Sequence, residues 1–196
     1  MNKKVERGRA TRDRLVEIAT GMFAEHGYEG TSIEAVLRTA EVSRGALYHH
    51  FDGKDGLFEA VFEAVELDAN RRLLAAVVDV EDPVEALRAG CLTWIELAGD
   101  DPVVQQVVLI DAPSVLGWQR WREVEERYGL GGTKLMLRRI AAAGRLSERY
   151  ADPFAHMLLA ALNETAILIA RSDDAAKALR DGRAAVKELL DRLLPE

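Results

Sequence analysis

Four residues between positions 44 and 49 have the types and spacing of side chains that contact DNA from a helix. At about 3.6 residues per turn, Gly45 and His49 lie opposite the apolar Leu47 and therefore face away from a core. Arg44 is long enough to reach past Gly45, and Tyr48 flanks the same side. Arginine can bind guanine through two hydrogen bonds, glycine permits close approach, and tyrosine and histidine can bond phosphates. The segment is therefore predicted to suit the major groove.

Further polar residues lie where helices are expected to begin and could hold phosphates there. Lys54 opens the segment that follows, so its ammonium and the free backbone N–H groups could bind one phosphate together. Thr31 and Ser32 occupy the same place before the preceding helix, and Ser43 is a favoured N-cap residue. Taken singly, each residue also fits a structural role, for example Tyr48 as a core aromatic and Lys54 as a solvated charge. Their joint arrangement favours DNA contact.

Two short helices joined by a tight turn are needed to present these residues. Ser32 precedes a short stretch whose apolar positions end at Ala40, and Ser43 begins a second stretch after a brief break. Helices joined this tightly are typical of a helix-turn-helix. The apolar spacing over residues 15–23 predicts a longer helix before them, ended by Gly27.

Charge is unevenly distributed along the chain. The formal net charge is −7, yet residues 1–51 carry eight basic and seven acidic side chains, which leaves −8 for the remainder. Six of the basic residues fall within positions 1–14, against two acidic ones. The N-terminal end is therefore the part expected to meet a phosphate backbone, although a solvated terminus accounts for the same charges.

The rest of the chain also predicts helices, and no stretch alternates apolar and polar residues long enough to predict a strand. Helices are expected at residues 54–80, from Pro83 and Pro102 onward, at 152–171 and at 174–194, with interrupted helices over 112–132. The helix at 152–171 is apolar nearly all round, which indicates burial in a core or in a subunit interface. We therefore expect an all-α fold with a three-helix N-terminal domain at residues 1–55 and a larger helical domain at 56–196.

The larger domain holds every tryptophan and several polar residues that interrupt apolar helices. Aromatic walls with a few polar groups are typical of ligand pockets. The candidate lining residues are Trp94, Gln105, Asp111, Trp118, Trp121, Tyr128 and Asn163. Alternatively, the tryptophans form a core and Asn163 bonds across a dimer interface. An acidic, aromatic domain permits a cationic ligand through cation–π contact, but it permits other ligands as well.

The sequence lacks the motifs of common enzyme classes. It has no Gly-x-Ser-x-Gly elbow, Gly-rich phosphate loop or His-Glu-x-x-His pair, and its histidines and single cysteine lack metal-ligand spacing. We therefore expect neither an enzyme nor a bound metal or other cofactor. The longest apolar runs are about six residues and the basic N-terminus leads into no apolar segment, so we expect no membrane helix, no secretory signal and a cytoplasmic location. A helical protein-interaction module is the remaining alternative, but it would leave the outward polar residues unexplained.

Residues 11–63 resemble the DNA-binding domain of the tetracycline-repressor (TetR) family. The resemblance is carried by residues 31–33 (TSI), 42–51 (VSRGALYHHF) and 54–57 (KDGL), above all by Tyr-x-His-Phe followed by lysine. It covers roughly a quarter of the chain, and the helical layout that follows is also similar to that of the family.

The resemblance implies a homodimeric transcription regulator, usually a repressor, that binds double-stranded operator DNA and is released by a small-molecule effector. Dimerisation would use the last two long helices. The resemblance also implies phosphate or backbone contacts by Thr31, Tyr48, His49 and Lys54, and base-facing roles for Arg44 and Gly45. Together with the helix-start residues Ser32 and Ser43, these form the predicted DNA site.

One residue departs from the family pattern in the turn between the two short helices. The family usually has glycine there, whereas this chain has Glu41. If Glu41 adopts the left-handed conformation, it costs on the order of 1 kcal/mol relative to glycine. Its negative charge is also expected to lie near the DNA.

Overall fold

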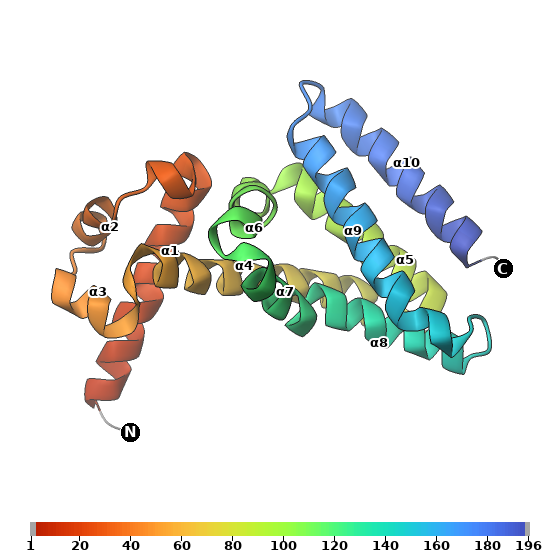
Figure 1. Ribbon diagram of the computed structural model, residues 1–196, viewed down its shortest axis with the longest axis horizontal. Coiled ribbons are helices and arrows are strands. Elements are labelled where there is room, and N and C mark those ends of the chain that lie inside the picture. The colour runs from red at the N-terminus through yellow and green to blue at the C-terminus, as the bar shows by residue number, and fades with distance from the viewer. Residues whose placement is uncertain (1–2, 195–196) are drawn as a thin grey trace. The chain divides into compact units, whose positions relative to one another are not determined.

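The computed structural model describes residues 3–194, with side chains from residue 5 onward. Within that range the regular elements are all helical, which confirms the predicted all-α class (Figure 1). They are α1 (Lys3–Gly30), α2 (Ile33–Ala40), α3 (Arg44–His50), α4 (Gly53–Val77), α5 (Pro83–Asp100), the π-helical η1 (Val104–Asp111), α6 (Ala112–Val115), α7 (Gly117–Arg127), α8 (Gly129–Ala142), the 3₁₀ turn η2 (Glu148–Tyr150), α9 (Ala151–Ala170) and α10 (Ala175–Leu193).

The chain forms two compact units, which we call the N-terminal and C-terminal units. The N-terminal unit comprises the chain up to residue 65 together with residues 102–121, and the C-terminal unit comprises 66–101 and the chain from 122 onward. The sequence places its domain boundary at residues 55/56, and that division stays a prediction. Residues 102–121 pack with the N-terminal helices because η1 lies against α1, where the backbone N–H of Tyr28 donates to Asp111 Oδ2 at 2.7 Å.

The core of the N-terminal unit explains why its helices take these positions. The fully buried side chains include Leu15 and Phe23 of α1, Leu47 of α3 and Phe58 of α4. The Phe23 and Phe58 rings meet edge to face, with centroids 5.1 Å apart. At Gly27, predicted to stop the first helix, the backbone leaves the helical conformation with φ 70°, and one further turn continues to Gly30.

Side-chain caps start both helices of the predicted helix-turn-helix. The Ser32 side chain accepts a hydrogen bond from the backbone N–H of Ala35, and the Ser43 side chain accepts one from Ala46. Between them, Glu41 ends α2 in the left-handed conformation with φ 55°. The structure therefore confirms both predicted caps and shows that this turn carries the conformational cost anticipated for a residue other than glycine.

In the C-terminal unit, α5, α8, α9 and α10 pack together, and α9 and α10 form an antiparallel pair (Figure 1). The predicted helices at 152–171 and 174–194 correspond to α9 and α10, with each end within one residue. Asp82 caps α5 with Pro83 in the first turn, as the Asp-Pro pair predicts. The segment predicted to be interrupted, 112–132, is divided among α6, α7 and the start of α8.

Helix α9 is not buried on every side within this chain. Leu158 and Leu162 are buried, but Met157 and Leu168 are 63% and 64% exposed. By length and composition, residues 148–170 could cross a membrane, a possibility that short apolar runs did not indicate. Core helices of helical bundles can have the same length and composition. The packing of α9 against α5, α8 and α10 matches such a core helix.

Candidate nucleic-acid surface and ligand cavity

Helix α3 presents the side that the sequence predicts to face DNA. Leu47 is fully buried, Tyr48 is 52% exposed, and His49 is exposed beside it. A side-chain carbon added at Gly45 would meet no atom of the described residues within 4 Å. The surface of α3 around Gly45 is therefore open, with Arg44 and Tyr48 at hand to contact a polyanion.

Arg44 is held at this surface by an acidic neighbour on α2. Its guanidinium donates to Glu34 Oε1, and both side chains remain more than half exposed. A hydrogen bond from its own backbone N–H, followed by the bond from Arg44, lowers the pKa of Glu34 below its ordinary value. Since an exposed ion pair contributes little stability, Arg44 can leave Glu34 for a stronger acceptor.

Lys54 is positioned by an aromatic ring rather than by an acid. Its Nζ lies 4.0 Å from the centroid of the Tyr28 ring, in a cation–π contact. The Tyr28 hydroxyl donates to Asp55, and burial followed by this hydrogen bond raises the pKa of Tyr28. Lys54 is the second residue of α4, so it belongs to the first turn of that helix, and its role in holding a phosphate stays a prediction.

Thr31 is buried, unlike the other residues of the predicted DNA site. It is only 3% exposed, and its hydroxyl donates to the backbone carbonyls of Met22 and Gly27 at 3.0 and 2.9 Å. These bonds tie the end of α1 to the start of α2, so the side chain positions the surface and does not face it. Ser32 and Ser43 are exposed, but their hydroxyl oxygens already act as caps.

The basic residues of α1 are partly engaged with neighbours. The Arg12 guanidinium lies 5.4 Å from the centroid of the Phe51 ring, and Arg14 Nη2 lies 3.8 Å from Glu41 Oε2. Both arginine side chains remain about half exposed. The side chains of Lys3 and Lys4 lie outside the described residues.

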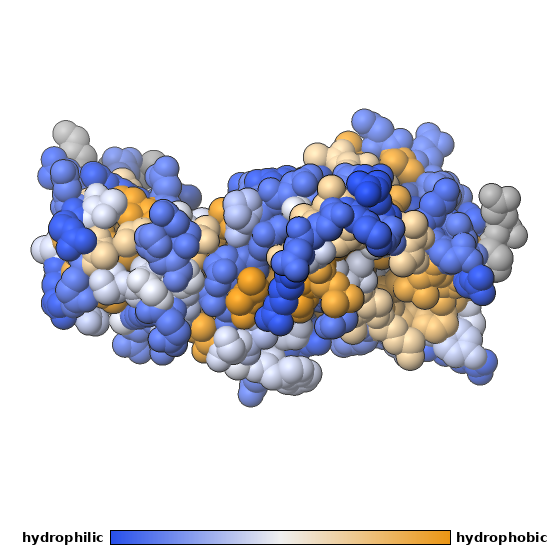
Figure 2. Space-filling view, turned by 90° about the horizontal axis from the view of Figure 1, so that it is seen from above, coloured by the Kyte–Doolittle hydropathy of each residue, from blue (hydrophilic) through white to orange (hydrophobic). Residues whose placement is uncertain are grey.

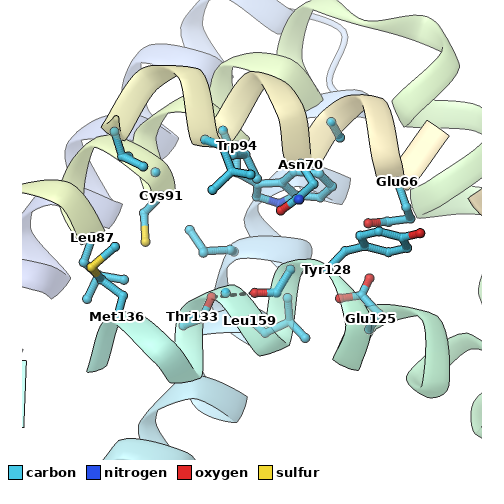
Figure 3. Close-up of a pocket in the computed structure, with 18 of the residues that line it drawn as sticks. Glu66, Asn70, Leu87, Cys91, Trp94, Glu125, Tyr128, Thr133, Met136 and Leu159 are labelled. Carbon is cyan, nitrogen blue, oxygen red and sulfur yellow. Dashed lines mark hydrogen bonds between the residues drawn. The ribbon is translucent and has the colours of Figure 1, made fainter. Parts of the chain in front are cut away.

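The C-terminal unit contains a cavity of about 130 Å³ (Figure 3). Its walls come from α4, α5, α7, α8 and α9 and are mostly apolar, including Leu87, Trp94, Met136 and Leu159. Its polar lining residues are Glu66, Asn70, Glu125, Tyr128, Thr133 and Asn163. A small apolar cavity with few polar groups is typical of a ligand site.

Three of the seven residues predicted to line a pocket do line this cavity, namely Trp94, Tyr128 and Asn163. The other four, Gln105, Asp111, Trp118 and Trp121, belong to the N-terminal unit and do not line it. Asp111 instead accepts the backbone N–H of Tyr28, and Trp118 is 69% exposed. The aromatic residues of 112–121 therefore do not form the wall that their clustering in sequence indicated.

Two carboxyl groups that the sequence analysis did not single out lie in the cavity wall. Glu66 is 4% exposed and Glu125 is 2% exposed, and Figure 3 shows both beside Tyr128 at one end of the cavity. Burial and the nearby Glu125 charge raise the pKa of Glu66 well above its ordinary value. Burial raises the pKa of Glu125 to about 7, although the Arg122 guanidinium acts in the opposite direction.

Three buried polar atoms of the cavity wall have no hydrogen-bond partner among the described residues. They are Glu66 Oε1, Trp94 Nε1 and Asn163 Oδ1. A buried polar group without a partner is costly, so such atoms call for an explanation. A signal for Glu66 existed in the sequence, because it follows Phe62 by four residues on the apolar side of its helix, where a charged residue is out of place. Glu125 follows the buried Val124 in a polar helix and gives no comparable signal.

Two family models match the chain. Residues 15–61 match the model described as bacterial regulatory proteins of the tetR family, and residues 84–193 match a tetracyclin repressor-like C-terminal domain. The first match contains α2 and α3 with their caps, and the second contains most of the helices that surround the cavity.

Similar proteins of known sequence align with part of the chain. The chain is 42% identical over 77 residues to the HTH-type transcriptional repressor AcnR of Corynebacterium diphtheriae, covering 39% of this chain and 38% of AcnR. It is 34% identical over 77 residues to the HTH-type transcriptional regulator UidR of Escherichia coli K12, covering 39% and 36%. The aligned segment thus spans less than two fifths of these curated relatives.

A solved structure matches along the entire chain. It is a TetR-family transcriptional regulator from Pectobacterium atrosepticum, which is 31% identical, with a TM-score of 0.84 over 100% of this chain and 99% of that one. The two family models and this match along the whole chain therefore indicate the same family. The chain belongs to the tetracycline-repressor (TetR) family of bacterial regulatory proteins.

Proposed function

We propose that this protein is a homodimeric transcriptional repressor that binds operator DNA through α3 and is released by a small molecule bound in the C-terminal unit. It would act on DNA in the cytoplasm. The observation that carries the proposal is the open side of α3, where Gly45 leaves space and Arg44, Tyr48 and His49 are exposed. Those residue types at that spacing suit the major groove and its phosphates.

The DNA-contacting set is narrower than the sequence predicts. Arg44 and Gly45 face the bases, while Tyr48, His49 and Lys54 hold phosphates. Ser32 and Ser43 contribute through the helix starts that they cap, and their backbone N–H groups support nearby phosphates. Thr31 acts indirectly, because its hydroxyl fixes the junction between α1 and α2.

Dimerisation is proposed through α9 and α10. These helices expose the large apolar side chains Met157, Leu168 and Leu189. Figure 2 shows apolar surface between hydrophilic areas in its right-hand half, which contains α9 and α10. Exposed apolar residues that form a contiguous patch are typical of protein–protein contacts. Two copies would then present two α3 helices to successive major grooves, about 34–36 Å apart, on a near-palindromic site.

The test is DNA binding by the full chain to two fragments of equal length. One fragment is the DNA that flanks its own gene, and the other has the same composition in shuffled order. Fluorescence anisotropy at fixed salt should show affinity for the flanking DNA at least about 10³-fold tighter than for the shuffled DNA. Equal affinities, or no binding to either fragment, would overturn the proposed function.

A further inference from the structure

The cavity of the C-terminal unit combines features that together specify the charge of its ligand. Its wall is mostly apolar, but one end carries the buried carboxyl groups of Glu66 and Glu125 (Figure 3). Glu66 Oε1 and Asn163 Oδ1 are acceptors without a partner among the residues described, and they come from two different helices of the cavity wall, α4 and α9. A ligand that satisfies both must therefore donate hydrogen bonds.

The two acids also leave an electrostatic imbalance at that end of the cavity. The Arg122 guanidinium lowers the pKa of Glu125, and one guanidinium can compensate only one of two carboxylates. Since like charges in a buried site cannot both ionise readily, the ligand-free site retains at least part of a proton. A cation placed there can replace that proton and compensate both carboxylates, whereas a neutral donor leaves the proton in place.

The aromatic residues around the acids favour the same kind of ligand. Tyr128 lies beside both carboxyl groups, and Trp94 lines the apolar part of the cavity (Figure 3). Aromatic faces attract ammonium groups, most strongly where water is excluded. The remaining walls, such as Leu87 and Leu159, suit an apolar body attached to the charged group.

We propose that the cavity binds an organic cation, an amine with an apolar body, whose ammonium group lies between Glu66 and Glu125. This inference rests on the proposed function, because it names the chemical class of the effector. Glu66 and Asn163 accept hydrogen bonds from the ammonium group, and Glu125 contributes the second carboxylate. The apolar body fills the space beside Trp94.

The proposal is tested with three probes that share a benzene ring and nearly the same length. They are phenethylamine, 2-phenylethanol and phenylacetate, which are a cation, a neutral donor and an anion at pH 7. Calorimetric titration of the full chain should show that phenethylamine binds at least about tenfold more tightly than 2-phenylethanol. Phenylacetate should bind most weakly. The proposal is overturned if the alcohol or the acid binds as tightly as the amine, or if none of the three binds.

Three matched variants assign the preference to particular carboxyl groups. Glu66→Gln and Glu125→Gln should each bring the affinity ratio of amine to alcohol close to one, while retained alcohol binding shows that the cavity is intact. Glu126→Gln removes the same charge from the adjacent exposed residue, so it should keep the full preference. An unchanged ratio in both cavity variants would overturn the assignment even if the wild type prefers the amine.

Proton release gives a second readout that does not depend on affinity. Among the lining residues, α4 supplies Glu66, α5 supplies Cys91 and the α7–α8 junction supplies Glu125 and Tyr128, whereas the α9 residues of the lining are not titratable. Burial raises the pKa of the Cys91 thiol to about 12, which keeps it protonated near neutrality. Titrations at pH 7 in phosphate and in Tris should therefore show that phenethylamine releases a proton from the carboxyl pair. Equal heats in the two buffers would contradict this.

The ligand class and the proposed function can fail separately. If the protein prefers the amine but its affinity for the flanking DNA does not change, the cavity binds cations but is not the effector site. If 2-phenylethanol releases the protein from DNA and phenethylamine does not, the proposed function is supported and the cation site is contradicted. Each outcome is read from the same wild-type protein.

Discussion

Acidic side chains serve opposite purposes in the two units. At the surface of the N-terminal unit, Glu34 holds Arg44, and Asp55 holds the tyrosine on which Lys54 rests. In the C-terminal unit, Glu66 and Glu125 are buried in an apolar cavity wall. The exposed carboxylates orient cations, whereas burial favours the protonated form of a carboxyl group. The surface of the N-terminal unit therefore suits an anionic partner, and the cavity of the C-terminal unit suits a cationic one.

The largest expected effect comes from the exposed apolar residues of α9. Leu168→Arg places a charge in the proposed dimer interface and should convert the dimer to a monomer at micromolar concentration, because an unpaired buried charge is costly. Sedimentation measures the mass, and tight specific DNA binding should be lost with it. Leu135→Arg, at an equally exposed site on α8, is the control and should stay dimeric. If Leu168→Arg remains a dimer, another surface joins the two copies.

The next effect concerns the pH dependence of stability, which the buried acids should dominate between pH 5 and 7.5. The pKa of Glu125 is about 7 in the folded protein and about 4.5 when unfolded, so the folded state binds more protons in this window. The contribution of Glu125 to the free energy of unfolding is fully present below pH 4.5. It falls by on the order of 3 kcal/mol as the pH rises to 7.

Thermal unfolding of Glu125→Gln measures that contribution. The variant should have a higher Tm than the wild type at pH 7.5 and a flatter dependence of Tm on pH. The exposed neighbour variant Glu126→Gln should follow the wild type. Parallel curves for wild type and Glu125→Gln would show that Glu125 ionises in the folded protein without cost, and the contrast between the two units would be lost.

A smaller effect separates the two kinds of contact made by the N-terminal surface. Arg44→Ala should cost about 1–3 kcal/mol on the flanking DNA and relax the preference at one base position. Lys54→Ala should weaken binding to flanking and shuffled DNA alike. It should also reduce the slope of log affinity against log salt concentration by about one. Anisotropy over a range of salt concentrations measures both. Equal losses on both DNAs for both variants would show that Arg44 does not face bases.

The smallest expected effect comes from the turn between α2 and α3. Glu41→Gly removes the left-handed strain and should raise the free energy of unfolding by about 1 kcal/mol. Glu41→Gln keeps the strain and removes only the charge, so it should leave stability nearly unchanged while strengthening DNA binding. Denaturant unfolding and anisotropy separate the two contributions. Equal stability of the glycine and glutamine variants would contradict the conformational argument.

The sequence predicted the N-terminal surface far better than the cavity. The caps at Ser32 and Ser43, the buried Leu47 and the exposed Tyr48 all follow from local rules of helix periodicity and capping, which the next few residues determine. The cavity depends on which distant helices pack together, so the position of Trp118 in the sequence could not show that it lies outside. The burial of Thr31 was not predicted either, because its hydroxyl bonds to carbonyl groups of α1 that lie four and nine residues earlier, across the break at Gly27.

Packing also changes which substitution tests the dimer. The apolar circumference of 152–171 makes Leu162 as reasonable a target as Leu168. The structure buries Leu162 at the cavity and leaves Leu168 64% exposed, so only the latter can report on association without damaging the core. Likewise, tryptophan emission cannot report on the C-terminal unit alone, since Trp118 and Trp121 belong to the N-terminal unit.

Regulation of DNA binding by the cavity is tested most directly by measuring the coupling between the two sites in both directions. The variant carrying Trp118→Phe and Trp121→Phe keeps Trp94 as its only tryptophan, at the cavity wall. Its emission gives the affinity for phenethylamine with and without saturating flanking DNA, and anisotropy gives the DNA affinity with and without saturating phenethylamine. We expect phenethylamine and DNA each to lower the affinity for the other by the same factor, about 5-fold to 150-fold, because coupling free energy is reciprocal. A factor of one in both directions would show that the cavity does not regulate DNA binding.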